Sequence, residues 1–98
     1  RFLMIYFAQI KPNGYIKIGY STDIDARLDA LSTGTPYELT LLGWMLGDCK
    51  QERKLHDRFA RYCVRCEWFE PAAEIIDYIN NVWTVIMWFT LNKCDVFW

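Results

Sequence analysis

The first twenty residues carry the pattern of a β-hairpin, and this pattern constrains the fold more than any other part of the chain. Phe2 to Ile10 is almost wholly apolar and rich in β-forming residues, as in a strand covered on both faces. Lys11-Pro12-Asn13-Gly14 follows as a turn, in which Asn-Gly supplies the positive φ that tight hairpins need. Tyr15 to Tyr20 is the second predicted strand.

Two registers are compatible with this turn, with Tyr15 opposite either Ile10 or Pro12. Both place Tyr6 and Lys17 on the same face of the sheet, because side chains alternate between the faces along a strand. A lysine inside an otherwise apolar strand belongs at a sheet edge or on a wet face, unless it lies where a phosphate binds. We therefore expect a functional site on this face of the hairpin.

The segment after the hairpin predicts a helix from Asp23 to Ser32. Thr22 is the expected N-cap, and Asp25 completes a short-armed capping box. Gly34 is expected to stop this helix in the left-handed conformation. Arg27 lies at the margin of the apolar stripe of the helix. Either its aliphatic stem covers the core, or its guanidinium serves a site.

A third strand, Leu39 to Leu46, leads into a second helix from Cys49 to about Tyr62. Asp48 and Gln51 form the capping box of this helix. On a helical wheel, Glu52 falls within the apolar face. A carboxylate that points at a core is costly unless it is paired or bound to a metal ion. Glu52 is therefore either half of a buried pair with an arginine or a functional residue.

The end of the chain differs in composition from the rest. Pro71 to about Asn80 predicts a last helix, and residues 1–81 make up the predicted domain. The tail of residues 82–98 is rich in tryptophan, and Val82 to Leu91 is mostly apolar. This run is shorter than the roughly 20 residues of a membrane span. We expect it to pack on the core or to form a surface for a homodimer or another partner.

Composition limits the class of function. A chain of 98 residues with 53% hydrophobic and 23% charged residues builds one globular domain. Its formal net charge of −1 argues against binding to nucleic acid by bulk charge alone. A nucleic-acid function would need a local basic patch or a metal ion. The N-terminal apolar run has no cleavage pattern of a leader peptide, so we expect a cytoplasmic protein.

The four cysteines are expected to be reduced thiols. Cys63 and Cys66 have the spacing of a zinc knuckle, and Cys49 and His56 could complete four ligands. A single CxxC pair is a weak signal, so a zinc-stabilised interaction domain is the least favoured hypothesis.

Several short motifs resemble those of one nuclease superfamily. Ile5-Tyr6 and Lys17-Ile18-Gly19 resemble the paired strands of the GIY-YIG nucleases, and the closer resemblance is to the phage and bacterial T5orf172 and Mug113 domains. The resemblance extends from about Met4 to Ile79. The matching residues follow the same order along the chain: Tyr6-Phe7, Ile16 to Ser21, Arg27-Leu28, Leu31, Glu52, Leu55-His56, Phe59 and Glu67-Trp68-Phe69.

The chain also departs from the superfamily pattern. Met4 stands where the first motif has glycine, and Lys17 stands where the second motif has tyrosine. Some restriction enzymes of the superfamily are similar in using a lysine there to position water. Tyr20 is a candidate substitute for the missing tyrosine, but strand alternation predicts that it lies on the opposite face.

The resemblance implies an α+β fold with a three-stranded antiparallel sheet flanked by helices. It implies an endonuclease that cleaves phosphodiester bonds in DNA with one divalent metal ion, Mg²⁺ or Mn²⁺. Tyr6 and Lys17 would orient or activate the attacking water, Arg27 would hold the scissile phosphate, and Glu52 would bind the metal. Further candidates are His56 and Glu67 near the catalytic site, and Gly19, Tyr20 and Ser21 for substrate binding.

The chemistry of these residue types agrees with that assignment. Hydrolysis of a phosphodiester requires an aligned nucleophile and cations that neutralise charge on the phosphate oxygens. An arginine fork can bind two of these oxygens at once. A lysine close to a tyrosine hydroxyl would lower the pKa of that hydroxyl. For His56, a hydrogen-bonding role at the edge of the core is the simpler expectation.

The alternative is a catalytically weak nucleic-acid-binding module. It would contact phosphates through a basic stripe on the second helix and the residues after it. This stripe comprises Lys50, Lys54, Arg58, Arg61 and Arg65. An ordinary solvated helix face gives the same pattern. In either case, specificity would come from a fused domain or a second subunit.

Overall fold

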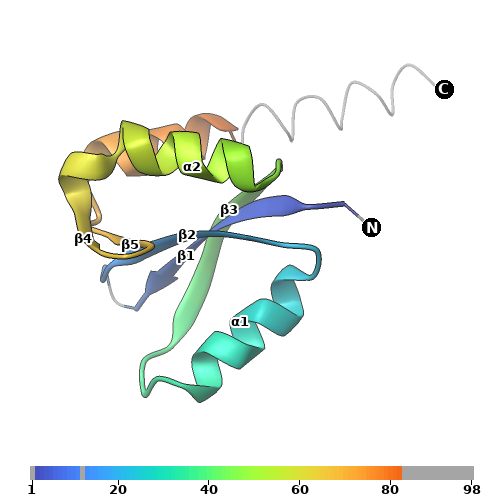
Figure 1. Cartoon of the computed structure of the whole chain (residues 1–98). Coiled ribbons are helices and arrows are strands. Elements are labelled where there is room, and N and C mark those ends of the chain that lie inside the picture. The colour runs from blue at the N-terminus through green and yellow to red at the C-terminus, as the bar shows by residue number, and fades with distance from the viewer. Residues whose placement is uncertain (1, 12, 83–98) are drawn as a thin grey trace, which may run out of the picture.

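The structure, a computed structural model, describes residues 2–11 and 13–82 (Figure 1). It contains one antiparallel sheet with strand order β3-β1-β2-β5-β4. Helix α1 covers one face of the sheet, and α2 and the helical residues 73–82 lie on the other (Figure 1). The strands and helices are β1 (Met4–Ile10), β2 (Ile16–Ser21), α1 (Ile24–Thr33), β3 (Leu39–Leu46), α2 (Cys49–Arg58), a 3₁₀ turn (Ala60–Tyr62), β4 (Cys63–Arg65) and β5 (Trp68–Phe69).

The α+β class is confirmed, but the expected number of three strands was wrong. The sheet has five strands, because β4 and β5 form a short hairpin that pairs with β2. These strands are three and two residues long, too short to show an alternating pattern in the sequence. Their turn contains Cys66 at φ 54°, a left-handed position where glycine or asparagine is the usual signal.

The hairpin of β1 and β2 adopts the first of the two expected registers. Tyr6 pairs with Gly19, and the backbone N–H of Ile10 donates to the carbonyl of Tyr15 at 3.1 Å. Asn13 has φ 52°, as the Asn-Gly turn requires. The prediction that Tyr6 and Lys17 share one face is therefore confirmed.

The helix ends were predicted with mixed success. The capping box of α2 is confirmed, because the Asp48 carboxylate accepts from the N–H of Gln51 while the Gln51 side chain accepts from the N–H of Asp48. The N-cap of α1 is Asp23 and not Thr22, since the Asp23 carboxylate reaches the N–H of Ala26. Gly34 ends this helix at φ −91°, so the expected left-handed conformation was wrong.

Two other helix limits differ from the expectation. Helix α2 ends at Arg58, earlier than predicted, and the 3₁₀ turn Ala60–Tyr62 follows it. Helical residues begin at 73, two positions after the predicted start at Pro71. Apart from its first residue, the predicted tail of residues 82–98 lies outside the described part of the chain. Within the described residues, no helix is long and apolar enough to cross a membrane.

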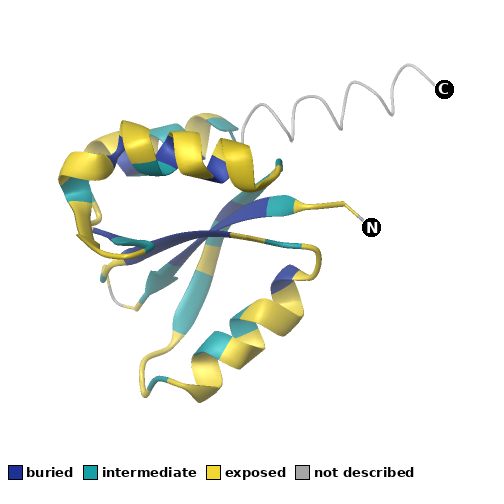
Figure 2. Cartoon of the chain, viewed as in Figure 1, coloured by how far each residue is buried: buried dark blue, intermediate teal, exposed yellow. Residues whose placement is uncertain are grey.

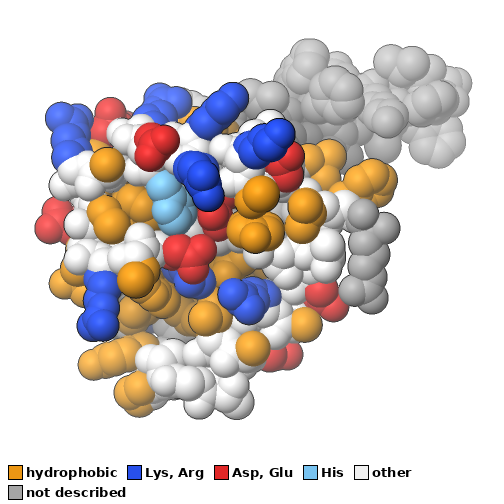
Figure 3. Space-filling model, in the orientation of Figure 1, with side chains coloured by type: hydrophobic (Ala, Val, Ile, Leu, Met, Phe, Trp, Pro, Cys, Tyr) orange, Lys and Arg blue, Asp and Glu red, His pale blue; other side chains and the backbone are white. Residues whose placement is uncertain are grey.

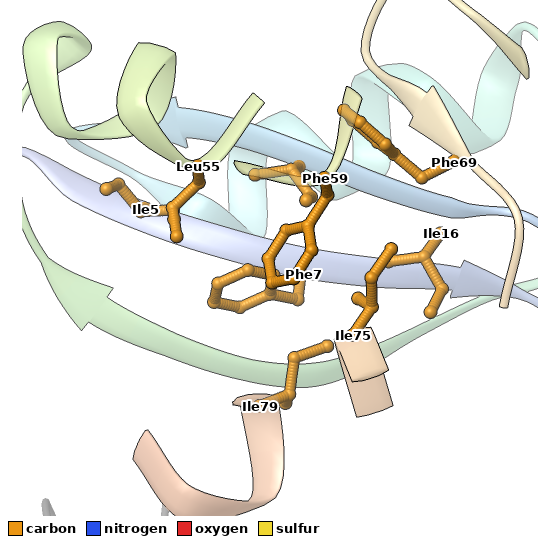
Figure 4. Close-up of a cluster of buried hydrophobic side chains, with 9 residues drawn as sticks. Ile5, Phe7, Ile16, Leu55, Phe59, Phe69, Ile75 and Ile79 are labelled. Atoms are coloured by element: carbon orange, nitrogen blue, oxygen red, sulfur yellow. The ribbon is translucent and has the colours of Figure 1, made fainter. Parts of the chain in front are cut away.

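The alternation of β1 divides the core into two layers. Ile5 and Phe7 point toward α2 and belong to the larger cluster (Figure 4). Tyr6 and Ala8 belong to a smaller cluster with Ile24 of α1. Buried residues follow β1, β2 and the inner side of α2, whereas α1 is mostly exposed (Figure 2). The larger cluster consists of Ile5, Phe7, Ile16, Ile18, Leu55, Phe59, Phe69, Ile75 and Ile79.

Candidate functional site

The candidate site lies along the edge of β2, where the covering strand β5 ends. On β2, strand β5 pairs only with the first two residues, Ile16 and Lys17. Beyond them, the N–H of Ile18 donates to the carbonyl of Glu67 at 3.1 Å. At the same edge, the carbonyl of Ile18 lies 2.9 Å from Nε2 of His56 on α2. The short β5 thus leaves room for polar groups from the β4–β5 turn and from α2 to meet at this edge.

Glu52, His56 and Glu67 form the polar cluster at this edge. One ligand atom from each of them lies within 4.8 Å of the other two. Glu52 is 9% exposed, and its Oε2 has no hydrogen-bond donor among the described residues, although the carboxyl groups of Glu52 and Glu67 lie close enough to share a proton. Burial raises the pKa of Glu52; His56 opposes this shift, and the neighbouring carboxylate of Glu67 adds to it. A divalent cation between these groups would supply the partner that the buried carboxylate lacks.

The contacts of His56 define its tautomer. A carbonyl oxygen only accepts hydrogen bonds, so the contact with Ile18 places the proton on Nε2. In the neutral imidazole, Nδ1 then carries the lone pair that a metal ion requires. An edge-on contact with the ring of Phe69, at 5.1 Å between centroids, also orients the imidazole. The expected hydrogen-bonding role of His56 is present, and the same hydrogen bond is the support that metal-bound histidines commonly have.

Lys17 forms a largely buried ion pair with Glu67. Its Nζ lies 2.8 Å from Oε2 of Glu67 and 5.4 Å from the centroid of the Trp68 ring. Lys17 is only 5% exposed. Burial alone would raise the pKa of Glu67, but the hydrogen bond and the charge of Lys17 lower it below its usual value. Lys17 therefore keeps Glu67 ionised and holds it beside Glu52.

The expected contact of Lys17 with the Tyr6 hydroxyl is not present among the described residues. Tyr6 pairs with Gly19 and Lys17 pairs with Ala8, so the two side chains leave the sheet two positions apart. The ring of Tyr6 lies over Gly19 instead. A Cβ atom on Gly19 would be 2.6 Å from the Tyr6 hydroxyl oxygen and 2.7 Å from Cζ. The space expected beside Gly19 is thus filled by the tyrosine ring.

An open pocket of about 370 Å³ adjoins the cluster and is lined by Tyr6, Tyr20, Ser21, Arg27 and Glu67. Acidic and basic side chains gather on this face beside the histidine (Figure 3). Arg27 is exposed and forms no ion pair with any described residue. Tyr20 was expected to face away from Tyr6, yet it lines the same pocket. The pocket lies at the end of β2, where β1 still pairs with β2 but β5 does not reach, so no strand separates the two faces of the sheet on the β5 side.

Comparison with known proteins identifies the family. The profile of the T5orf172 domain matches residues 3–84. The chain belongs to the T5orf172 domain family. This membership indicates a nuclease-like or nucleic-acid-binding domain, for which DNA is the expected partner. No curated protein and no solved structure matches the chain.

In this T5orf172 domain, Glu67 connects the pocket with the polar cluster. It lines the pocket together with Tyr6 and Arg27, and it also contacts Lys17 and belongs to the cluster with Glu52. The resemblance marked Glu67 only as a secondary candidate, because the superfamily often has an amide or another polar group near this position. Trp68, beside Lys17, was not singled out as a site residue.

The cysteines do not support a zinc site in this T5orf172 domain. Cys49, Cys63 and Cys66 are free and exposed. Among the described residues, the cluster of Glu52, His56 and Glu67 is the only group of three or more potential metal-ligating side chains, and it contains no cysteine. His56 therefore lies with carboxylates and not with thiols.

Replacement of Gly19 by alanine is expected to destabilise this T5orf172 domain by about 1–3 kcal/mol, because the added methyl group would push the buried Tyr6 ring away. Urea denaturation measures this loss. Gly34→Ala is the matched control, since the nearest atom to a Cβ there is 3.8 Å away and φ is negative. Equal stability of the two variants would contradict the close contact between Gly19 and Tyr6.

Proposed function

We propose that this T5orf172 domain is a metal-dependent endonuclease that hydrolyses phosphodiester bonds in DNA. The observation that carries this proposal is the buried, unpartnered Oε2 of Glu52 beside Glu67, which lines the same pocket as Tyr6 and Arg27. A buried carboxylate with no partner costs free energy in a purely structural role. Binding of a cation at this site would compensate the buried charge, and the cation would in turn bind a phosphate.

The residues of the cluster fit a divalent ion. Glu52 and Glu67 would supply carboxylate oxygens, and His56 would supply Nδ1. Mg²⁺ prefers oxygen ligands, whereas imidazole also suits Mn²⁺ and later metals. We therefore propose Mn²⁺ or Mg²⁺ as the ion, with tighter binding of Mn²⁺. The bound ion would neutralise charge on the phosphate and make a water molecule more acidic.

The remaining residues would bind and orient the substrate. The Arg27 guanidinium, unpaired among the described residues, is proposed to hold two oxygens of the scissile phosphate. Tyr6 lines the same pocket, and its hydroxyl is proposed to orient the attacking water. Lys17 would act through Glu67, by keeping that carboxylate charged and in place. Lys17 is therefore a positioning residue in this proposal.

Removal of metal is expected to stop cleavage. The purified protein is incubated with supercoiled plasmid in EDTA, and then with added Mn²⁺ or Mg²⁺. We expect nicked and linear products only after metal is added. We also expect Mn²⁺ alone to raise the melting temperature, because ligands that bind only the folded state stabilise it. Cleavage that persists in excess EDTA, or no cleavage of any DNA with either ion, would contradict the proposal.

A second candidate function is binding to nucleic acid with little cleavage. It is favoured by the basic stripe of Lys50, Lys54, Arg58, Arg61 and Arg65, whose members are all exposed. Two of these cations already have partners, because Arg61 pairs with Glu74 at 3.2 Å and Arg58 lies 4.9 Å from the ring centroid of Tyr78. Binding that decreases steeply with salt and needs no metal would support this function.

A further inference from the structure

A second pocket lies at the opposite end of α1 from the candidate catalytic pocket. It has a volume of about 260 Å³ and lies between the sheet and the last turn of α1. Its walls are largely apolar, and they include Ile10, Leu31, Leu39 and Trp68. Neither the resemblance nor the proposed catalytic roles uses this pocket.

Two contacts connect this apolar pocket with the catalytic pocket. Glu67 lines the catalytic pocket and Trp68 lines the apolar pocket, and consecutive Cα atoms are only about 3.8 Å apart. Lys17 bridges the same two residues, at 2.8 Å from the Glu67 carboxylate and 5.4 Å from the centroid of the Trp68 ring. Lys17 and the Glu67–Trp68 peptide therefore lie between the two pockets.

We propose that the apolar pocket binds an unpaired nucleobase of the nucleotide next to the scissile phosphate, stacked on Trp68. This inference rests on the proposed function for the position of the phosphate. Along a nucleic-acid strand, each base is followed by a phosphate. In the protein, an apolar pocket with an aromatic side chain lies next to a polar pocket that contains an unpaired arginine. Stacking on an aromatic side chain needs no particular base, since every base has a π-face.

The proposal defines a substrate class. A base inside an intact duplex is paired and stacked, so it cannot enter a side pocket unless it leaves the helix. The cost of extrusion is least at a mismatch, and it vanishes in a single strand. Under this proposal, strands that carry an unpaired nucleotide at the cleavage position are therefore better substrates than fully paired duplexes.

The first test measures binding of a fluorescent single-stranded oligonucleotide with Ca²⁺ in place of the catalytic ion. Trp68→Ala is expected to weaken binding about 5- to 100-fold, and Trp68→Phe to keep most of the affinity. Ala30→Trp fills the pocket from an exposed helix position and leaves Trp68 in place, so it is expected to weaken binding as well. Melting temperatures identify variants that fail to fold. Unchanged affinity in both Trp68→Ala and Ala30→Trp would overturn the proposal.

The second test removes the base instead of the indole. An abasic site is moved along the oligonucleotide, and at one position it should weaken wild-type binding as strongly as Trp68→Ala does. Trp68→Ala should lose nothing further at that position. An equal effect at every position, or additive losses, would overturn the proposal. Cleavage without dependence on Trp68 would reject the base site alone, whereas base-dependent binding without cleavage by any metal would reject the nuclease function alone.

Discussion

Replacement of Glu52 by glutamine is expected to reduce metal-dependent cleavage by about a thousandfold or more. The amide keeps the size of the side chain but removes the charge that would hold the ion. Several kcal/mol of transition-state stabilisation depend on that ion, and each 1.36 kcal/mol is about tenfold in rate. Single-turnover cleavage with saturating Mn²⁺ measures the loss, and titration calorimetry without DNA measures Mn²⁺ affinity. Glu70→Gln, at an exposed position nearby, is the matched control.

The same variant should be at least as stable as the wild type. Burial raises the pKa of Glu52 in the folded protein, so ionisation of this carboxyl group destabilises the fold at pH values above that pKa. Glutamine carries no such cost. In metal-free buffer, the stability advantage of Glu52→Gln should therefore be present at pH values above the folded pKa of Glu52, decrease as the pH falls through that pKa, and be absent below the lower pKa of the unfolded chain. Urea denaturation over this pH range tests whether the stability difference between Glu52→Gln and the wild type changes in this direction. A Glu52→Gln variant that is inactive and also strongly destabilised would indicate a structural role for the carboxylate.

Replacement of Arg27 by alanine is expected to reduce kcat/KM about 10²- to 10³-fold, the range found when one donor to a developing oxyanion is removed. Arg27→Lys should recover only part of this loss, because an ammonium group cannot bind two phosphate oxygens in a fork. The stability of both variants should change by no more than about 0.5 kcal/mol, since Arg27 is exposed. A large loss of stability in Arg27→Ala would instead support the interpretation in which the stem covers the core.

The control for Arg27 is Lys54→Ala, in the basic stripe on the outer side of α2. If the site around Arg27 carries the function, this change should leave the cleavage rate nearly constant and weaken DNA binding only slightly. A strong, salt-dependent loss of binding in Lys54→Ala, with no effect of Arg27→Ala, would favour the binding module over the nuclease.

Local patterns predicted the parts of the fold that local chemistry determines. Asn-Gly predicted the turn and therefore which side chains of the two strands share a face of the sheet. Asp48 with Gln51 predicted the start of α2. The burial of Glu52 was also visible, because a carboxylate on the apolar face of a helix violates the helical period. These signals act over a few residues, so a single sequence suffices to read them.

The remaining features depend on contacts between distant segments. The ion pair of Lys17 with Glu67 joins residues 50 positions apart, and no local pattern indicates it. The turn of β4 and β5 depends on Cys66 in a conformation that cysteine rarely adopts. The N-cap of α1 was misplaced by one residue, because Thr22 and Asp23 are both good capping residues and only the packing of the turn decides between them.

The order of the site residues along the chain has a consequence for the synthesis of the domain in a cell. Tyr6, Lys17 and Arg27 come from the first third of the chain, whereas Glu52, His56 and Glu67 are synthesised later and lie on α2 or in the β4–β5 turn. A nascent chain or a proteolytic fragment that stops before α2 therefore contains the groups proposed for the phosphate and the water but no group proposed for the cation. The proposed hydrolytic activity therefore requires the complete domain, with α2 and the β4–β5 turn in place.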